Sequence, residues 1–284
     1  MNDKLTQREY WDSVHETGPA KAGVLRAAVN RIKQRLARRL GESFVEAVRD
    51  YSEYLLWRVI LDHHLPREKG LRVLEIGSAP GFNLLKFHKM FGYEPYGIEY
   101  TQNGVELNRR LFRERGIDPT QVIQGDFLSD EVRRPLEGRF DIVTSFGFVE
   151  HFSDVRTIVE KHLQLLKSGG LLVVGIPNIA GANDLLTRFF HRDVLSLHNL
   201  SIMDETSFRS LFERPELKTR FCGYFGAFTF YLFNTKPGSM KRFVLSGCRG
   251  LQRVLNVAFY LLFRNRGWEH PRFSPYLLFI GQKT

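Results

Sequence analysis

One segment limits the folds open to this chain more than any other: the run VLEIGSAPGFN, residues 73–83. An apolar, strand-like stretch leads into a turn that contains Gly77, Ser78 and Gly81, and helix-forming residues follow. Glycines in such a turn let a ligand approach the backbone closely, and the N-terminus of the next helix supplies oriented N–H groups. The segment therefore predicts a strand, a ligand-binding turn and a helix, which is the opening unit of an α/β fold.

The same alternation continues downstream. From Leu71 onward, short apolar runs are separated by helical stretches, as expected of parallel βαβ units. The pattern predicts strands at residues 72–76, 96–99, 122–125, 140–145 and 171–176, and helices at residues 82–91, 104–116, 154–166 and 204–212. Two aromatic runs, Phe225–Phe233 and Pro275–Gly281, are predicted to be the last two strands.

Two helices are predicted before the first strand. Residues 21–40 place apolar side chains at helical spacing with basic side chains between them. Ser43 and Glu46 have the spacing of a capping box for a second helix, which Pro66 would end. We therefore expect a helical cap over residues 1–66 and an α/β domain over residues 67–284.

An insertion, residues 234–273, separates the two predicted C-terminal strands and contains a further amphipathic helix. Its apolar positions lie on one helical face and its arginines on the other: Cys248, Leu251, Leu255, Ala258 and Leu262 against Arg242, Arg249 and Arg253. The apolar face can either pack on the core or form a lid or membrane-facing surface, and the sequence leaves both open.

Charge and cysteine content limit the binding partners and metal sites that can be expected. The formal net charge is +10, and residues 21–39 contain seven Lys or Arg and no acid, which is compatible with an anionic membrane surface or with RNA. The two cysteines, Cys222 and Cys248, are far apart, so no structural zinc site is expected.

The N-terminus lacks the pattern of a secretion signal, and no stretch reaches the roughly 20 apolar residues of a membrane span. We expect a cytoplasmic protein, with peripheral attachment to the inner face of the membrane as an alternative.

Acidic residues follow the predicted strands at the positions where a nucleotide-like ligand would be bound. Glu99 ends the second strand, where a carboxylate can accept hydrogen bonds from both hydroxyls of a ribose. Asp126 and Phe127 follow the third strand, and Glu75 precedes the first glycine of the turn. Carboxyl ends of parallel strands meet at one edge of a sheet, so these residues are expected along the same edge, one set after each strand in turn.

Taken in order, the segments VLEIGSAPG, GIEY, GDF, FDIVTSFGFVEHF and LLKSGGLLVVGIPN resemble the class I S-adenosylmethionine-dependent methyltransferases. The resemblance is strong over about residues 70–180. It implies a Rossmann-like, mostly parallel seven-stranded sheet with helices on both faces and one antiparallel strand in the last hairpin. A nicotinamide dehydrogenase fits less well, because its G-x-G-x-x-G pattern would need glycine where Ala79 and Phe82 stand.

The resemblance also implies a cofactor, S-adenosylmethionine, with S-adenosylhomocysteine as the product. By residue, it implies that Gly77, Ser78 and Gly81 face the methionine part and that Glu99 binds the ribose. It further implies that Asp126 and Phe127 bind the adenine, that Glu75 orients the turn or the methionine amine, and that Phe146 lies beside the sulfonium.

Two histidines are candidates for the base that removes a proton from the acceptor. His151 lies in FVEHF, which the family pattern places near the reacting methyl group, and His198 lies in a segment that borders the acceptor in this family. Either can instead be a pocket-wall or surface residue. No metal is expected, because the quinone-pathway methyltransferases that this segment resembles carry an additional acid upstream of the Glu-His pair, where Phe146, Gly147 and Phe148 stand here.

The acceptor is predicted only as a class. We expect O-methylation of a small molecule, a glycan or a lipid-linked intermediate, because the acceptor motifs of nucleic-acid base methyltransferases are missing. The basic N-terminal helix keeps an RNA methyltransferase open, and the cofactor motifs alone are compatible with a non-catalytic regulator that binds S-adenosylmethionine. Tyr10 and Trp11 resemble the start of many small-molecule methyltransferases, where such residues either fold over the cofactor or anchor the segment by packing.

Overall fold

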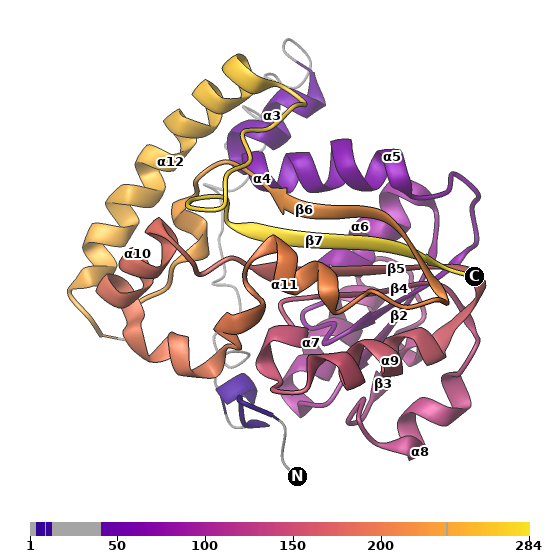
Figure 1. Ribbon diagram of the computed structural model, residues 1–284. Helices are drawn as coiled ribbons and strands as arrows, with labels where there is room; N and C mark the ends of the chain where they lie inside the picture. Colours follow the sequence, from indigo (N-terminus) through magenta and orange to yellow (C-terminus); the bar gives the residue numbers. More distant parts are fainter. Residues whose placement is uncertain (1–3, 9, 13–40, 237) are drawn as a thin grey trace.

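The computed structural model describes residues 4–8, 10–12, 41–236 and 238–284. Its centre is a seven-stranded sheet in the order β3-β2-β1-β4-β5-β7-β6 (Figure 1). The strands are β1 (Arg72–Ile76), β2 (Glu94–Glu99), β3 (Val122–Gln124), β4 (Phe140–Phe146), β5 (Leu166–Pro177), β6 (Leu217–Phe225) and β7 (Tyr276–Lys283). The first five strands pair in parallel, and β7 pairs antiparallel with both β5 and β6. This is the Rossmann-like fold that the sequence predicts.

Helices cover both faces of the sheet. They are α3 (Glu42–Arg49), α4 (Tyr51–Tyr54), the π-helical η1 (Leu55–Leu61), α5 (Asp62–His64), α6 (Phe82–Phe91), α7 (Gln102–Arg113), α8 (Asp130–Arg133), α9 (Val155–Leu165), α10 (Ala182–His191), α11 (Glu205–Ser210) and α12 (Lys241–Phe263). Successive side chains of a β-strand point to opposite faces of the sheet, so alternate residues of each buried strand pack against the helices on each face. In β1, Leu74 packs with α9 and α11 on one face, whereas Val73 packs with η1, α6 and α7 on the other.

The helices that precede β1 are part of the main core. Trp57 and Leu61 of η1 are buried in the same cluster as Val73 of β1 and Phe87 of α6.

The predicted helix over residues 21–40 lies outside the described residues. The predicted capping box is wrong: α3 begins at Glu42 after Gly41 without a side-chain cap. Asp50 instead breaks the helix and caps α4, where its carboxylate accepts a hydrogen bond from the Glu53 N–H at 3.1 Å.

The prediction of a strand over Phe225–Phe233 is also wrong. The sixth strand is the less apolar segment Leu217–Phe225, an edge strand that pairs only with β7 and therefore exposes part of its length. Gly226, with φ of 84°, follows it and turns the chain away from the sheet. The aromatic residues that follow are buried elsewhere: Phe233 packs with Phe190 of α10 and Leu245 of α12. The last predicted strand, by contrast, matches β7.

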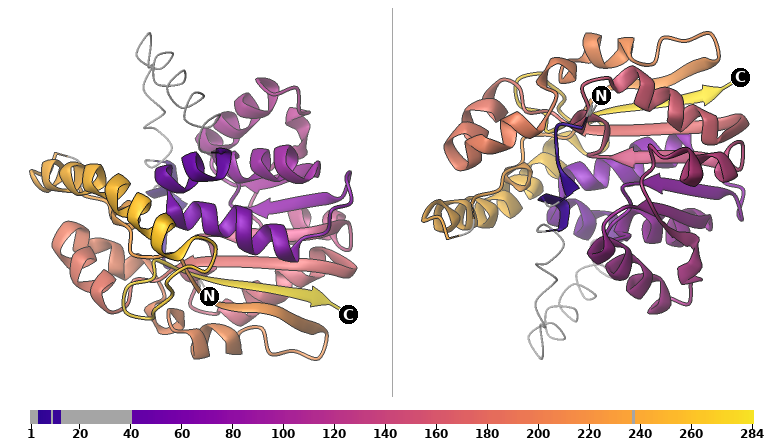
Figure 2. Two further views of the ribbon diagram at one scale, coloured as in Figure 1. Left: turned by 90° about the horizontal axis from the view of Figure 1, so that it is seen from above. Right: turned by 90° about the horizontal axis from the view of Figure 1, so that it is seen from below.

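The strand order of the sheet indicates where a ligand would bind. β1 pairs with β2 on one side and with β4 on the other, so the strand order reverses at β1, where α/β sheets bind ligands. The N-terminal segment that begins at Lys4 crosses this edge, since Lys4 forms a β-bridge with Phe152 (Figure 2). Helices α10 and α12 lie beyond the same edge (Figure 1).

Candidate functional site

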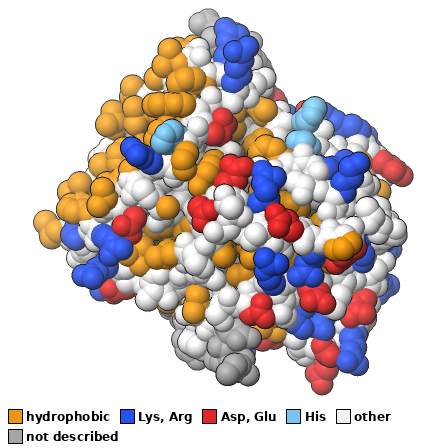
Figure 3. Space-filling view, in the orientation of Figure 1, with side chains coloured by type: hydrophobic (Ala, Val, Ile, Leu, Met, Phe, Trp, Pro, Cys, Tyr) orange, Lys and Arg blue, Asp and Glu red, His pale blue; other side chains and the backbone are white. Residues whose placement is uncertain are grey.

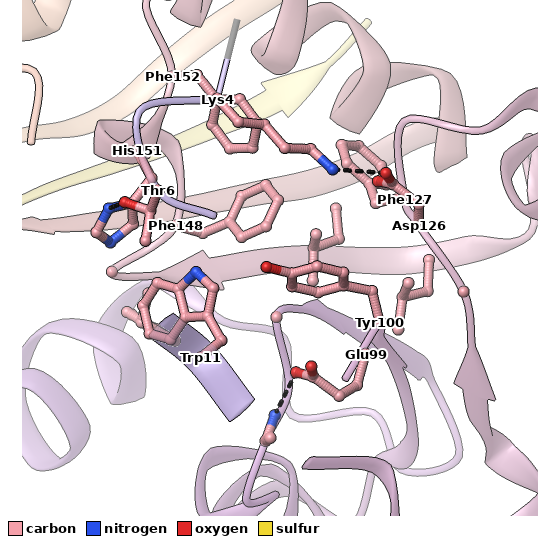
Figure 4. A pocket seen from close by; sticks show the side chains of 17 residues that line it. Lys4, Thr6, Trp11, Glu99, Tyr100, Asp126, Phe127, Phe148, His151 and Phe152 are labelled. Carbon is pink, nitrogen blue, oxygen red and sulfur yellow. Dashed lines mark hydrogen bonds and ion pairs between the residues drawn. The ribbon is translucent and has the colours of Figure 1, made fainter. Parts of the chain in front are cut away.

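A cavity of about 150 Å³ lies at the carboxyl edge of β1, β2 and β4 (Figure 4). Six of the residues predicted to bind cofactor or substrate line it together: Gly77, Glu99, Asp126, Phe127, Phe146 and His151. They come from four different strand ends, so the sheet topology brings together residues that are up to 74 positions apart in the sequence, from Gly77 to His151. The turn after β1 and the loop after β2 form the floor of this cavity.

The turn after β1 needs glycine at two positions. Gly77 has φ of 71°, and a Cβ atom there would lie 3.0 Å from the ring of Phe148. Gly81 has φ of 95°, and a Cβ atom there would lie 2.2 Å from the side-chain oxygen of Asn108. Ser78 is buried, and its hydroxyl accepts a hydrogen bond from Asn108 at 2.8 Å. Gly77 therefore lines the cavity, whereas Ser78 and Gly81 are not among the residues that line it and shape the turn from behind.

Glu99 is held in place by its own loop. Its Oε1 accepts hydrogen bonds from the backbone N–H of Thr101 at 2.9 Å and from the Thr101 hydroxyl at 2.7 Å. Its Oε2 faces the backbone N–H of Ala79 at 3.4 Å. Gly104 permits this packing, because a Cβ atom there would lie 2.9 Å from the Glu99 carboxyl carbon. The carboxylate is thus rigid and faces the cavity, as recognition of a diol requires.

The opposite end of the cavity combines an acid with aromatic rings. Asp126 Oδ2 forms an ion pair with the ammonium group of Lys4 at 2.5 Å, which comes from the N-terminal segment (Figure 4). Phe127 is buried, and its ring makes edge contacts with Phe148 and with the buried His162. An apolar slot that ends in a carboxylate suits a flat heterocycle with an exocyclic amino group.

Glu75 is fully enclosed beneath the turn. Its Oε1 accepts a hydrogen bond from Asn83 at 2.7 Å, and its Oε2 has no partner among the described residues. Desolvation, with a smaller contribution from Glu99, raises the pKa of Glu75 to about 8. A buried carboxylate oxygen without a partner is costly, and an ammonium group in the adjoining site would compensate for that cost.

A second cavity of about 490 Å³ adjoins the first. Phe146, Gly147 and His151 line both cavities. The remaining walls of the second cavity are Asp50, Glu53, Leu56, Trp57, Asn83, Glu150, Gly175, Ile176, Pro177, His198, Phe225 and Tyr276. Aromatic rings and carboxylates dominate this lining, and its described residues include no Lys or Arg.

The two predicted histidines lie side by side where the cavities meet. The ring centroids of His151 and His198 are 4.6 Å apart. His151 Nδ1 lies 2.8 Å from the carbonyl oxygen of Leu197, and His198 Nδ1 lies 2.7 Å from that of Val194. A carbonyl oxygen only accepts hydrogen bonds, so these contacts favour a proton on each Nδ1 and a free lone pair on each Nε2. The Thr6 hydroxyl, 2.8 Å from His151 Nδ1, fits this tautomer because it donates to the same Leu197 carbonyl at 3.1 Å. Desolvation and the neighbouring His198 lower the pKa of His151 to about 4, which keeps its ring neutral at neutral pH.

Glu150 completes this group. Its side chain is 1% exposed, one oxygen has no partner among the described residues, and Oε1 lies 3.9 Å from His151 Nε2. Burial raises the pKa of Glu150 to about 8. One ligand atom from each of Glu150, His151 and His198 lies within 4.8 Å of the others, so the same three residues could also hold a divalent cation. The predicted absence of a metal therefore stays a prediction.

Comparison with known proteins now adds the family. A family model described as "Methyltransferase domain" matches residues 45–219, which is more than half of the chain. The chain belongs to this methyltransferase family. Members of its class I branch use S-adenosylmethionine as the methyl donor, and the residues of the first cavity fit that molecule, with Glu99 for the ribose and Asp126 and Phe127 for the adenine. Glu75 does not line the cavity, and its unpartnered oxygen lies beneath the turn.

Relatives with curated descriptions match this methyltransferase over part of their length. It is 30% identical over 118 residues to "Uncharacterized methyltransferase YcgJ" of Bacillus subtilis (strain 168), which is 42% of this chain and 45% of that protein. It is 29% identical over 111 residues to "Ubiquinone biosynthesis O-methyltransferase" of Chelativorans sp. (strain BNC1), which is 39% of this chain and 42% of that protein. The methyltransferase thus spans less than half of the length of these two relatives.

A solved structure shows the same fold. The geranyl diphosphate C-methyltransferase of Streptomyces coelicolor A3(2) aligns with a TM-score of 0.52 and 14% sequence identity, over 82% of this chain and 78% of that chain. At this identity the likeness concerns the fold alone.

Several residues of the methyltransferase site escaped the sequence analysis. Lys4 and Tyr100 line the first cavity, and Asp50 and Glu150 line the second. The sequence does point to Glu150, because it forms the Glu-His pair of the FVEHF segment with His151. Asp50 had none, because only the tertiary fold brings the loop between α3 and α4 beside the ends of β4 and β5. Trp11 does line the first cavity, where its ring makes an edge contact with His151 at 5.0 Å.

Proposed function

We propose that this protein transfers the methyl group of S-adenosylmethionine to a hydroxyl oxygen of a small or lipid-linked acceptor bound in the second cavity. The observation that carries the proposal is the shared wall: Phe146, Gly147 and His151 line both cavities. A donor in the first cavity and an acceptor in the second would meet at His151. Methyl transfer needs such a contact, because the nucleophile must approach in line with the breaking C–S bond.

The chain's own residues supply the remaining requirements. Bound S-adenosylmethionine supplies a methyl group that is already electrophilic because it is attached to a sulfonium. His151 accepts the proton of the acceptor hydroxyl at Nε2 while the oxygen forms its bond to the methyl carbon, and the electrons of the broken C–S bond stay on sulfur. The carbonyl of Leu197 fixes the required tautomer. Glu150, whose Oε1 lies 3.9 Å from His151 Nε2 and whose pKa burial raises to about 8, would stabilise the imidazolium only in its ionised form.

The lining of the second cavity supports a neutral acceptor that donates hydrogen bonds. Asp50 and Glu150 offer carboxyl oxygens, whereas Glu53 is already paired with Arg49 and Lys86. Trp57, Phe225 and Tyr276 offer rings against which a sugar or an aromatic ring can pack. Binding of RNA would require Lys or Arg near the reacting atoms to contact phosphates, and the described lining has neither. A non-catalytic regulator would have no need for a second cavity that meets the first.

The test is a turnover assay with methyl-labelled S-adenosylmethionine. The panel should contain phenols, free sugars, polyprenol-linked sugars and, as the competing class, total RNA. We expect label in an alkali-stable ether of a hydroxylated acceptor, identified by mass spectrometry, together with S-adenosylhomocysteine. Label in RNA with none in the hydroxylated compounds would contradict the proposal. Saturable cofactor binding without any turnover would favour the regulator.

A further inference from the structure

Helix α12 buries two amide side chains and exposes much of its apolar surface, while Leu245, Phe259 and Phe263 pack inward. Gln252 and Asn256 are buried beneath it and hydrogen-bond to each other at 2.9 Å. Gln252 also accepts from the Phe230 N–H at 2.9 Å and donates to the Phe228 carbonyl at 3.2 Å. Asn256 donates to the Val48 carbonyl at 3.1 Å. These bonds fix the rotation of the helix, and of the arrangements that the sequence leaves open they favour the one in which Leu251 and Leu262 face solvent.

The outward side of α12 carries most of the exposed large apolar residues of the described chain. Phe243 is 73% exposed and Leu262 is 74% exposed. We call the following set the α12 face: Met240, Phe243, Val244, Leu251, Val254, Leu261 and Leu262. The set extends onto α10 through Phe189, whose ring lies 4.8 Å from the Lys241 ammonium. Figure 3 shows these side chains as a continuous apolar band. Soluble proteins seldom leave such a band uncovered unless something binds to it.

The charged residues of α12 itself and of the segments directly before and after it are all basic. No Asp or Glu occurs between Glu216 and Glu269, a stretch that includes all of α12. The basic residues in and beside the helix are Lys236, Lys241, Arg242, Arg249, Arg253, Arg264 and Arg266. An apolar band edged mainly by cations, of which Lys236 pairs with Asp193, is complementary to a surface that combines acyl chains with anionic head groups.

We propose that the α12 face docks the protein on an anionic lipid surface, with α12 lying in the plane of the membrane. None of the helices that the structure describes is both long and apolar enough to cross a bilayer. This proposal concerns where the protein works and does not depend on the acceptor or on turnover.

Two other occupants of the α12 face fit less well. A second copy of the chain would bring its own row of arginines against this one, and like charges across an interface oppose association. The segment 21–39 of the same chain carries seven Lys or Arg and no acid, so it would repel the basic edge in the same way. Charge therefore favours the lipid surface over both.

Docking on this side would also present the second cavity to the membrane. Helix α12 packs on α3, and Asn256 contacts the backbone of Val48 and Arg49, immediately before the cavity residue Asp50. An acceptor with a lipid tail could then enter the second cavity from the bilayer.

The test compares the full chain with two single variants in vesicle co-sedimentation. The vesicles contain phosphatidylcholine alone or phosphatidylcholine with phosphatidylglycerol. We expect the wild type to bind the anionic vesicles and to bind neutral vesicles poorly. Leu262→Glu should weaken binding to anionic vesicles roughly tenfold or more, because it places a charge in the apolar band. Leu200→Glu is the matched control, since Leu200 is exposed outside the band and the charge change is identical.

Three outcomes would overturn the proposal. The first is a wild type that does not bind anionic vesicles. The second is a Leu262→Glu variant that binds as well as the wild type, which would assign any membrane contact to another part of the chain. The third is a wild-type dimer, seen by sedimentation without lipid, that Leu262→Glu dissociates while vesicle binding is absent. Leu251→Glu should repeat the result of Leu262→Glu, and circular dichroism shows that each variant is folded.

Discussion

At the scale of single residues, the site depends on carboxylates and imidazoles whose environments are set by burial. Glu99 makes its hydrogen bonds to its own loop and stays ready for a ligand. Glu75 and Glu150 each keep one buried oxygen without a partner among the described residues. His151 is held neutral by desolvation, with its protonated nitrogen turned to a carbonyl. These states follow from the packing of neighbours more than from the residue types themselves.

Glu99→Ala should weaken binding of S-adenosylmethionine by about 10-fold to 100-fold, because a charged hydrogen-bond acceptor contributes about 1.5–3 kcal/mol. Isothermal titration calorimetry with S-adenosylmethionine and S-adenosylhomocysteine measures the change. Asp126→Ala should weaken binding in the same direction. Glu94→Ala is the control, because Glu94 starts the same strand and lies outside the cavity. Normal binding by both site variants would show that the first cavity is not the cofactor site.

His151→Gln should lower kcat by about 10²-fold to 10⁴-fold, the range for loss of a general base, with the dissociation constant of S-adenosylmethionine nearly unchanged. Steady-state kinetics and calorimetry on the same preparation separate the two quantities. A chelator provides the second readout: activity should survive it if His151 acts as a base. Activity that the chelator removes and a divalent ion restores would instead identify Glu150, His151 and His198 as metal ligands.

At the scale of elements, the N-terminal segment closes the first cavity. Lys4 pairs with Asp126, Leu5 donates its N–H to the His151 carbonyl at 2.7 Å, and Trp11 packs against the His151 ring. The enclosed volume of about 150 Å³ is below the roughly 300 Å³ at which pockets for drug-sized ligands begin. We therefore expect the segment to move outward for the cofactor to enter and to fold back over it.

Trp11→Ala should speed the release of S-adenosylhomocysteine about tenfold, because a smaller side chain covers the cavity less completely. Stopped-flow displacement with excess S-adenosylmethionine measures the release rate. The substitution Trp268→Ala serves as a comparison, since Trp268 is exposed near the end of α12 and does not line the cavity. An unchanged release rate in Trp11→Ala would show that the segment is a packing anchor only.

At the scale of the whole molecule, the buried carboxylates link stability to pH. The pKa of Glu75 is about 8 in the folded protein, whereas the ordinary value for a glutamate is 4.5. At Glu75 the folded state therefore binds more protons than the unfolded state between these values, so the Glu75 contribution to the free energy of unfolding falls as pH rises from about 4.5 to about 8. Glu150 contributes in the same direction. The buried His151 and His162, whose pKa values burial lowers from 6.5 to about 4, act in the opposite direction between those two values.

Glu75→Gln should flatten this dependence by a few kcal/mol across that interval, because glutamine keeps an acceptor for Asn83 and cannot ionise. Urea unfolding of the cofactor-free protein at several pH values measures it. The substitution Glu68→Gln, in the exposed turn before β1, provides a control that should leave the slope unchanged. A steep slope that persists in Glu75→Gln would assign the linkage to other groups.

The sequence predicted the elements correctly where the local residue pattern and the tertiary packing require the same residue types. β1 and α6 have the predicted bounds, Arg72–Ile76 and Phe82–Phe91, because a strand buried on both faces is mostly apolar and the turn that follows contains glycine. The pattern failed at Phe225–Phe233, since an aromatic run reports burial and does not say whether a strand or a loop is buried. At α12 the pattern left the orientation open, because helical spacing shows that an apolar face exists and does not show which way it points.

The sequence by itself thus determined the Rossmann-like fold, the family resemblance and the strand-end acids, because these depend on local chemistry repeated at fixed spacing along the chain. Only the tertiary structure decided which of these groups meet. It joined two cavities at His151, placed Glu150 and His198 beside it, and turned the apolar side of α12 to solvent. Burial, pairing and orientation arise from contacts between residues distant in sequence, and no local pattern encodes them.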